Sequence, residues 1–105
     1  MDWSLSAAQL ERRVRAFDPW PGCYTRWDGK QVKVLKAIAI DKEVVEGEKP
    51  GRVVSRGGNT DVSTAVVTGK GLLGLKRVQL AGGRPQDIKE FIRGHRRFEG
   101  AALAS

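Results

Sequence analysis

The chain has 105 residues, of which 40% are hydrophobic and 30% are charged. This length suits one domain with a modest core and excludes a large two-domain enzyme, while the composition excludes a disordered or fibrous protein. Nineteen lysines and arginines against twelve acidic residues give a net charge of +7, which favours a polyanionic partner or an anionic membrane surface.

A helix is predicted close to the amino terminus. Ser6 and Gln9 have the spacing of a capping box, in which each satisfies a backbone N–H of the first helical turn. Leu10, Val14 and Phe17 then follow at i, i+4 and i+7, which predicts one narrow apolar stripe on the helix.

A stiff connection and a hairpin are predicted next. Asp18-Pro19 ends the helix, because proline disfavours α geometry in the residue before it, and Pro19-Trp20-Pro21-Gly22 reads as an extended turn. Two alternating stretches then flank Asp28-Gly29, the sequence most typical of a two-residue hairpin turn. They predict strands at Cys23–Trp27 and Gln31–Leu35.

The second strand is expected to continue to Ile40 and to bend or bulge, because it is long enough to serve two faces of a curved sheet. Residues 41–49 are charged and read as a loop before the turn at Pro50-Gly51. Glycine-rich turns at 57–59 and 69–71 divide the rest of the sheet, and a short helix that stops at Gly94 closes the fold. The expected elements are strands at Arg52 to Ser55, Val62 to Thr68 and Leu72 to Leu80, a loop at Ala81 to Pro85, and a helix at Gln86 to Arg93.

The sequence offers little support for catalysis. His95, the only histidine, lies among arginines and reads as a surface residue, and Cys23 reads as a small packing residue. One cysteine and one histidine cannot form a structural zinc site, so we expect no metal. The lone cysteine, the lack of an apolar run long enough to span a membrane and the lack of a signal peptide predict a cytoplasmic protein with no membrane partner, and the fragment is expected to be a monomer.

The positive charge is the more informative feature. Residues 1–40 and 70–105 are basic, whereas residues 41–69 carry a slight excess of acid. Lysine and arginine bind phosphate without reading base sequence, so a shared basic face would suffice for RNA affinity. Trp20 and Trp27 flank the first strand and are expected to pack in the core and not on bases. The candidate RNA-binding residues are Lys33, Lys36, Lys76, Arg77, Arg84, Arg93, Arg96 and Arg97.

Most of the chain resembles the carboxy-terminal domain of methionyl-tRNA formyltransferases. The specific part is the helix and "NPWPGA"-like connection, here Asp2 to Ala8 and Arg13 to Gly22. The likeness continues through Tyr24-Thr25, Asp28-Gly29-Lys30, Val32-Lys33-Val34, Pro50-Gly51, Gly71-Leu72-Leu73, Leu75 to Gln79 and Phe91-Ile92-Arg93-Gly94.

The resemblance implies a mainly β fold, an OB-like barrel of five to six strands with an amino-terminal linker helix and a short carboxy-terminal helix. It implies residues 1–20 as the linker helix from an absent catalytic domain and residues 21–105 as the barrel. In the family, a Rossmann-type domain transfers a formyl group from 10-formyltetrahydrofolate to initiator methionyl-tRNA, and the barrel helps to hold the tRNA. The family's catalytic motifs have no counterpart in this sequence, so no cofactor and no activity are expected of the fragment itself.

Two departures bear on the residues. Asp18 replaces the family's usual asparagine, and Gly83-Arg84-Pro85 replaces a loop that is often richer in lysine, which weakens Arg84 as a tRNA contact. Related sugar-nucleotide formyltransferases and folate hydrolases can carry a similar domain. A structural buttress of such a small-molecule enzyme is therefore the alternative to tRNA binding, and an independent single-strand binder would need exposed aromatic residues.

Overall fold

The computed structural model describes residues 1–18, 20–40, 47–55 and 63–104. Within these residues neither helix is long and apolar enough to cross a membrane. The elements, in chain order, are α1 (Ala7–Phe17), β1 (Cys23–Trp27), β2 (Lys30–Ile40), β3 (Val53–Ser55), β4 (Thr64–Val67), β5 (Leu72–Leu80), β6 (Pro85–Asp87) and α2 (Ile88–Gly94). The predicted mainly β architecture, with one helix before and one after the strands, is confirmed.

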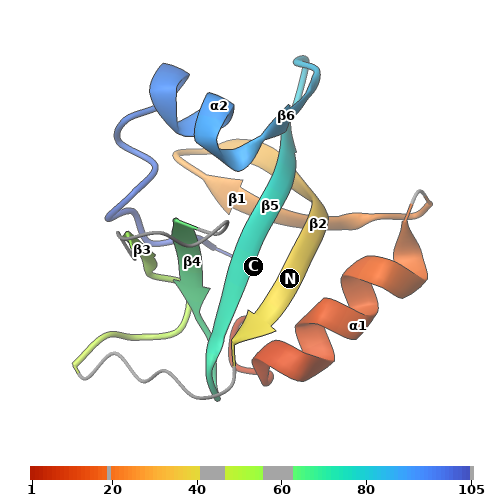
Figure 1. Ribbon diagram of the computed structural model, residues 1–105, viewed down its shortest axis with the longest axis vertical. Coiled ribbons are helices and arrows are strands. Elements are labelled where there is room, and N and C mark those ends of the chain that lie inside the picture. Colours follow the sequence, from red (N-terminus) through yellow and green to blue (C-terminus); the bar gives the residue numbers. More distant parts are fainter. Residues whose placement is uncertain (19, 41–46, 56–62, 105) are drawn as a thin grey trace.

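The strands form one antiparallel sheet in the order β1-β2-β5-β4-β3. The long strands β2 and β5 run side by side through the middle of the molecule and curve strongly (Figure 1). β4 pairs with the first part of β5 and β6 with its last part, so both short strands share one edge of β5.

The last described residues connect the two outer edges of this sheet. Ala104 and Arg26 of β1 exchange two backbone hydrogen bonds of 2.9 Å, and the Leu103 N–H donates to the Gly51 carbonyl at 2.8 Å. Bridges therefore run from this segment to both β1 and the residues before β3. The curled sheet is closed into the expected barrel-like shape by a segment that the sequence did not mark as a strand.

The hairpin and the bend of β2 both form as predicted. Asp28 and Gly29 have φ values of 51° and 76°, the positive pair that a type I′ turn requires. Val34 pairs with Val78, but the next pair is Lys36 with Arg77. Leu35 is left without a partner in a β-bulge, which bends the strand.

Helix α1 packs on the sheet through fewer residues than expected. Its capping box forms, since the Gln9 N–H donates to the Ser6 hydroxyl and the Gln9 side chain accepts from the Ser6 N–H. Leu10 and Val14 are buried in the main core, but Phe17 is 41% exposed. The predicted stripe is wrong at this position, because Phe17 is the last residue of α1 and lies at a surface pocket instead of over the sheet.

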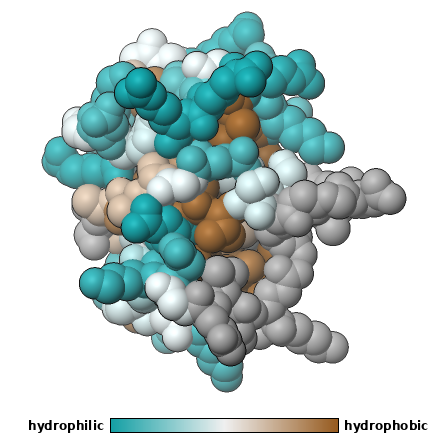
Figure 2. Space-filling model, turned by 90° about the vertical axis from the view of Figure 1, so that its left-hand side faces the viewer, coloured by the Kyte–Doolittle hydropathy of each residue, from teal (hydrophilic) through white to brown (hydrophobic). Residues whose placement is uncertain are grey.

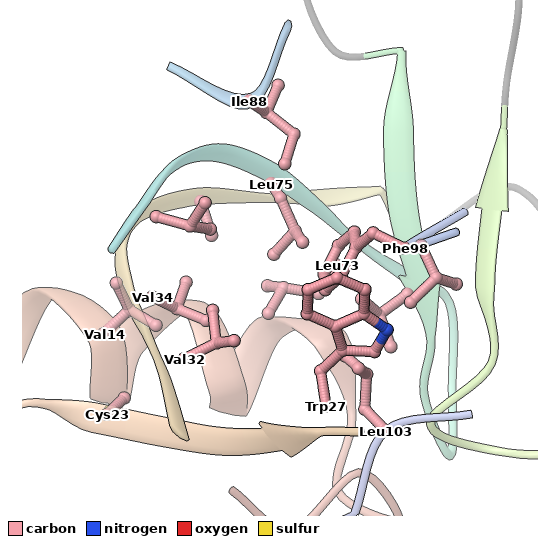
Figure 3. Packing of buried hydrophobic residues seen from close by; sticks show 14 of the residues in the cluster. Val14, Cys23, Trp27, Val32, Val34, Leu73, Leu75, Ile88, Phe98 and Leu103 are labelled. Carbon is pink, nitrogen blue, oxygen red and sulfur yellow. The ribbon is translucent and has the colours of Figure 1, made fainter. Parts of the chain in front are cut away.

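The main core is one large cluster to which both helices, β1, β2 and β5 contribute. Val14, Val34, Leu75 and Ile88 point into the same interior from four different elements (Figure 3). Trp27 is buried as predicted, and its ring meets the ring of Phe98 edge to face at 5.3 Å between centroids. A second, small cluster lies around Ala65, Val67 and Leu72.

The prediction for Trp20 is wrong, because its side chain is 85% exposed. Trp20 lies in the connection before β1, outside the alternation that sends Cys23, Thr25 and Trp27 inward. The same alternation sends Tyr24 outward, where it is 38% exposed.

The region after β5 also differs from expectation. The predicted loop ends in β6, which pairs with β5 at Arg77 to Gln79, and α2 begins at Ile88. Pro85 lacks an N–H, which a short edge strand tolerates because its outer side needs no donor. Gly94 is the last residue of α2, and His95 is the C-cap. Residues 41–46, the Gly57-Gly58-Asn59 turn and Val62 lie outside the described residues.

We expect Thr25→Val to lower the free energy of unfolding by about 1–3 kcal/mol. The buried Thr25 hydroxyl accepts from the Trp3 indole N–H at 3.0 Å and donates to the Ala104 carbonyl at 2.6 Å. Valine would leave the Trp3 indole N–H without its acceptor and would remove one of the two hydrogen bonds to the Ala104 carbonyl, which also accepts from the Arg26 N–H. Thr25→Ser keeps the hydroxyl and serves as the control. Urea unfolding measures the difference, and equal stability of Thr25→Val and the wild type would contradict this account.

Burial raises the pKa of the Cys23 thiol, against the weaker opposing charges of the amino terminus and Arg13. The folded chain therefore holds less thiolate at pH 8 than the unfolded chain does, and thiolate is the reactive form. We expect Ellman's reagent to react at least about tenfold more slowly with the folded chain than with the chain in urea. The free energy of unfolding should also fall as the pH rises past about 8.5, because the thiol of the unfolded chain loses its proton before that of the folded chain. Equal rates in both states would contradict the buried position.

Candidate nucleic-acid interface

A second irregularity in the central strand pair turns two adjacent cations away from the core. Ala37 pairs with Leu75 directly after the pair of Lys36 with Arg77, so Lys76 has no partner on β2. In a regular strand, adjacent side chains point to opposite faces. Here Leu75 and Val78, the residues on either side, belong to the core, and the bulge leaves both Lys76 and Arg77 outside it.

These cations meet at one surface pocket of about 370 Å³. Lys36 contributes from β2 and Lys76 and Arg77 from β5, while Lys89 of α2 and Asp87 of β6 complete the lining together with Ile88. Asp87 forms an ion pair with Arg77, with 3.3 Å between its Oδ1 and a guanidinium nitrogen. Four cations against one carboxylate leave the pocket strongly positive, as a phosphate-binding surface must be.

Lys89 is a member of this pocket that sequence reasoning missed. It follows the buried Ile88 and is exposed. The apolar pattern of the predicted helix implied an outward position for Lys89, but only the packing of α2 beside β5 and β6 brings it to the cations of the sheet.

Two other predicted residues lie elsewhere. Lys33 lies at a different pocket, beside Gln31 and Gln79, with its Nζ 5.8 Å from the centroid of the Tyr24 ring. Arg84 forms an ion pair with Glu90, with 3.1 Å between nitrogen and oxygen. A contact between Arg84 and tRNA stays a prediction.

The three other predicted arginines lie in the last turn of α2 and directly after the helix. Arg93 is exposed in the last turn, and Arg96 and Arg97 line a pocket of about 550 Å³ next to Trp27. Figure 2 shows hydrophilic residues gathered over the top of the molecule, the end at which α2 lies in Figure 1. A single face shared by all eight predicted residues remains a prediction.

His95 was expected on the surface because arginines surround it in the sequence, but its side chain is partly buried. Its ring stacks on Phe91 with 4.3 Å between centroids, and its Nδ1 lies 3.0 Å from the Phe91 carbonyl oxygen. Trp27 contacts the same ring edge to face. Within the part of the chain that the structure describes, no three His, Cys, Asp or Glu side chains come together as a metal site.

Comparison with known proteins identifies the relatives of this barrel. Residues 1–96 match the family described as formyl transferase, C-terminal domain. Methionyl-tRNA formyltransferases of Lachnospira eligens, Roseiflexus sp. and Pseudoalteromonas translucida are 41%, 39% and 37% identical over 106, 103 and 94 residues. These alignments cover 98%, 98% and 90% of this chain, but only 33%, 30% and 28% of the relatives.

The chain thus spans about a third of the length of the relatives that it matches. The resemblance based on the PWPG connection, the hairpin and the strand motifs is confirmed across almost the whole chain. The chain belongs to the formyl transferase C-terminal domain family.

Proposed function

We propose that this chain is the tRNA-docking domain of a methionyl-tRNA formyltransferase and helps to hold initiator methionyl-tRNA during translation initiation in the cytoplasm. Its second partner would be the Rossmann-type catalytic domain of the full-length protein. The family membership and the names of the three relatives support this assignment. The observation on which it rests is the convergence of Lys36, Lys76, Arg77 and Lys89 around one pocket.

The geometry of the pocket suits the RNA backbone. Lys36 and Arg77 are directly paired across β2 and β5, so the strand pairing holds the backbones of the two cationic residues side by side. Such contacts neutralise phosphates and orient the RNA without reading its bases. Specificity for the initiator tRNA would then reside mainly in the rest of the full-length protein.

We also propose that the chemistry of formyl transfer lies outside this chain. 10-Formyltetrahydrofolate would supply the formyl group in the catalytic domain of the full-length protein. Among the residues that the structure describes, the two usual candidates for catalysis do not fit such a site: Cys23 is buried in the core, and the ring of His95 is held between Phe91 and Trp27. The role left to this domain is to bind and orient the tRNA.

The decisive test is tRNA binding across a salt series with Lys36→Gln/Lys76→Gln. Both side chains are cationic members of the pocket and are expected to contact phosphate. Loss of two phosphate contacts should reduce the slope of log affinity against log salt by roughly 1.4 to 1.8. Fluorescence anisotropy of labelled initiator tRNA provides the measurement.

Arg12→Gln/Lys49→Gln is the matched control, because it removes two exposed positive charges that do not line this pocket. It should lower affinity slightly and leave the slope close to that of the wild type. Equal effects of the two double variants would contradict a specific docking pocket. An absence of tRNA binding by the wild type even at low salt would favour the buttress of a small-molecule formyltransferase instead.

Removal of the carboxylate in the pocket should raise tRNA affinity, whereas removal of the lysines should lower it. Asp87→Asn removes the partner of Arg77 and the negative charge beside the other cations. We expect tRNA affinity to increase about two- to fivefold at low salt, because a like charge no longer faces the phosphates. Glu48→Gln removes an exposed carboxylate that pairs with Arg52 instead and is the control. Weaker binding by Asp87→Asn would count against phosphate contact at this pocket.

A further inference from the structure

Three aromatic side chains are exposed around the connection between α1 and β1. Trp20 is almost fully exposed, and Phe17 and Tyr24 are partly exposed on either side of it in the chain. Phe17 and Tyr24 line the same surface pocket, of about 170 Å³. Single exposed apolar residues are ordinary on a protein surface. Three large exposed rings around one turn are more typical of a binding site.

A backbone hydrogen bond joins the residue at the end of the Trp20 connection to α1. The Gly22 N–H donates to the Phe17 carbonyl at 2.8 Å, which joins the start of the sheet to the end of α1. Gly22 has a φ of 88°, and a Cβ at this position would lie 2.5 Å from the Lys33 Cε atom. The positive φ favours glycine at this turn, and a larger residue would have to displace the end of the Lys33 side chain. Trp20 lies two residues before this hydrogen-bonded glycine, and its side chain is open to solvent.

Cations border the aromatic group on two sides. Arg13 lies four residues before Phe17 on α1, on the same side of the helix, and lines the pocket that Phe17 and Tyr24 share. On the other side, the Lys33 Nζ lies over the Tyr24 ring. Aromatic rings next to lysine and arginine are the arrangement with which proteins bind unpaired nucleotides, since the rings stack on bases and the cations meet phosphates.

Acidic groups also lie beside these rings. Asp2 lines the same pocket, where its carboxylate accepts hydrogen bonds from the Ser4 N–H at 3.0 Å and from the Ser4 hydroxyl at 2.5 Å. Asp18 is exposed at the C-cap of α1. Glu11, further back on the helix, forms an ion pair with Arg15.

We propose that Trp20, flanked by Phe17 and Tyr24, is a stacking site for an unpaired RNA base. The site is separate from the phosphate pocket around Lys76, and it rests on the proposed function because its ligand is a base of the same bound RNA. Single-stranded loops and ends are the parts of a folded RNA whose bases can leave the helix and stack on an aromatic side chain. The sequence predicted that Trp20 packs in the core. The structure instead has the exposed rings that an RNA-stacking surface needs.

The test uses the intrinsic fluorescence of Trp20 and two substitutions. Trp3 and Trp27 are buried, so Trp20 is the tryptophan that a ligand reaches, and Trp20→Phe identifies its share of the emission. Initiator tRNA should quench this share on binding. A blunt RNA duplex with the same number of phosphates should bind without quenching it, because its bases remain stacked within the helix.

Affinity separates stacking from other uses of the same side chain. We expect Trp20→Leu to weaken tRNA binding about tenfold without changing the salt slope, and Trp20→Phe to retain most of the affinity. Leucine would still provide an apolar contact for a protein partner but has no ring to stack. Because Trp20 is exposed, thermal unfolding should show that both variants fold like the wild type.

Each remaining outcome has one meaning. If tRNA binds without quenching Trp20 and Trp20→Leu binds as well as the wild type, the stacking site is wrong and the docking function stands; the aromatic group would then suit a protein partner. Equal quenching by tRNA and duplex would overturn the assignment to an unpaired base. If neither RNA binds at low salt, the docking function fails and the stacking site fails with it.

Discussion

The pairing of β2 with β5 is the interaction on which the rest of the fold depends. These strands pair from Val32 with Leu80 to Ile40 with Leu72, and the whole sheet is built outward from them. Their two neighbouring bulges bend the pair, and a bend is what allows a sheet of so few strands to curl around a core. Because of the same irregularity, two adjacent residues, Lys76 and Arg77, both lie outside the core. One local departure from regular pairing therefore serves both the shape of the barrel and its positive surface.

The edges of the sheet are protected by short segments and not by full strands. The segment at residues 102–104 bridges to β1 and to the residues before β3, and the buried hydroxyl of Thr25 joins it to Trp3. Unpaired edges are sites of aggregation, and covering them is a common solution. Met1 and Ala104 both form hydrogen bonds to the backbone of β1, at Tyr24 and Arg26.

Charge and aromatic surface are placed on different elements, and this separation has a physical consequence. Contacts between lysine or arginine and phosphate depend strongly on salt and carry no sequence information. Stacking on Trp20 would depend little on salt and would recognise the conformation of the RNA, since only an unpaired base can stack. Together the two surfaces would place a folded RNA on this domain in one orientation, while a regular duplex could engage only the basic surface.

Local patterns in the sequence determined the elements of this protein. The capping box at Ser6, the positive φ values at Asp28-Gly29 and the alternation of β1 all depend on residues close in the chain. Such patterns can be read directly because turns, caps and strand faces obey short-range geometry. They located five strands and both helices, and the resemblance of the PWPG connection identified the family.

Only the tertiary structure decided which of the charged and aromatic residues share a surface. Lys89 lines the same pocket as Lys36 because α2 packs beside the bulged strands. Arg84 forms an ion pair with Glu90. Trp20 is exposed because the turn before β1 places it outside the sheet. These outcomes depend on strand register and helix packing between residues distant in sequence, and one shift in register moves a side chain from one face of a sheet to the other.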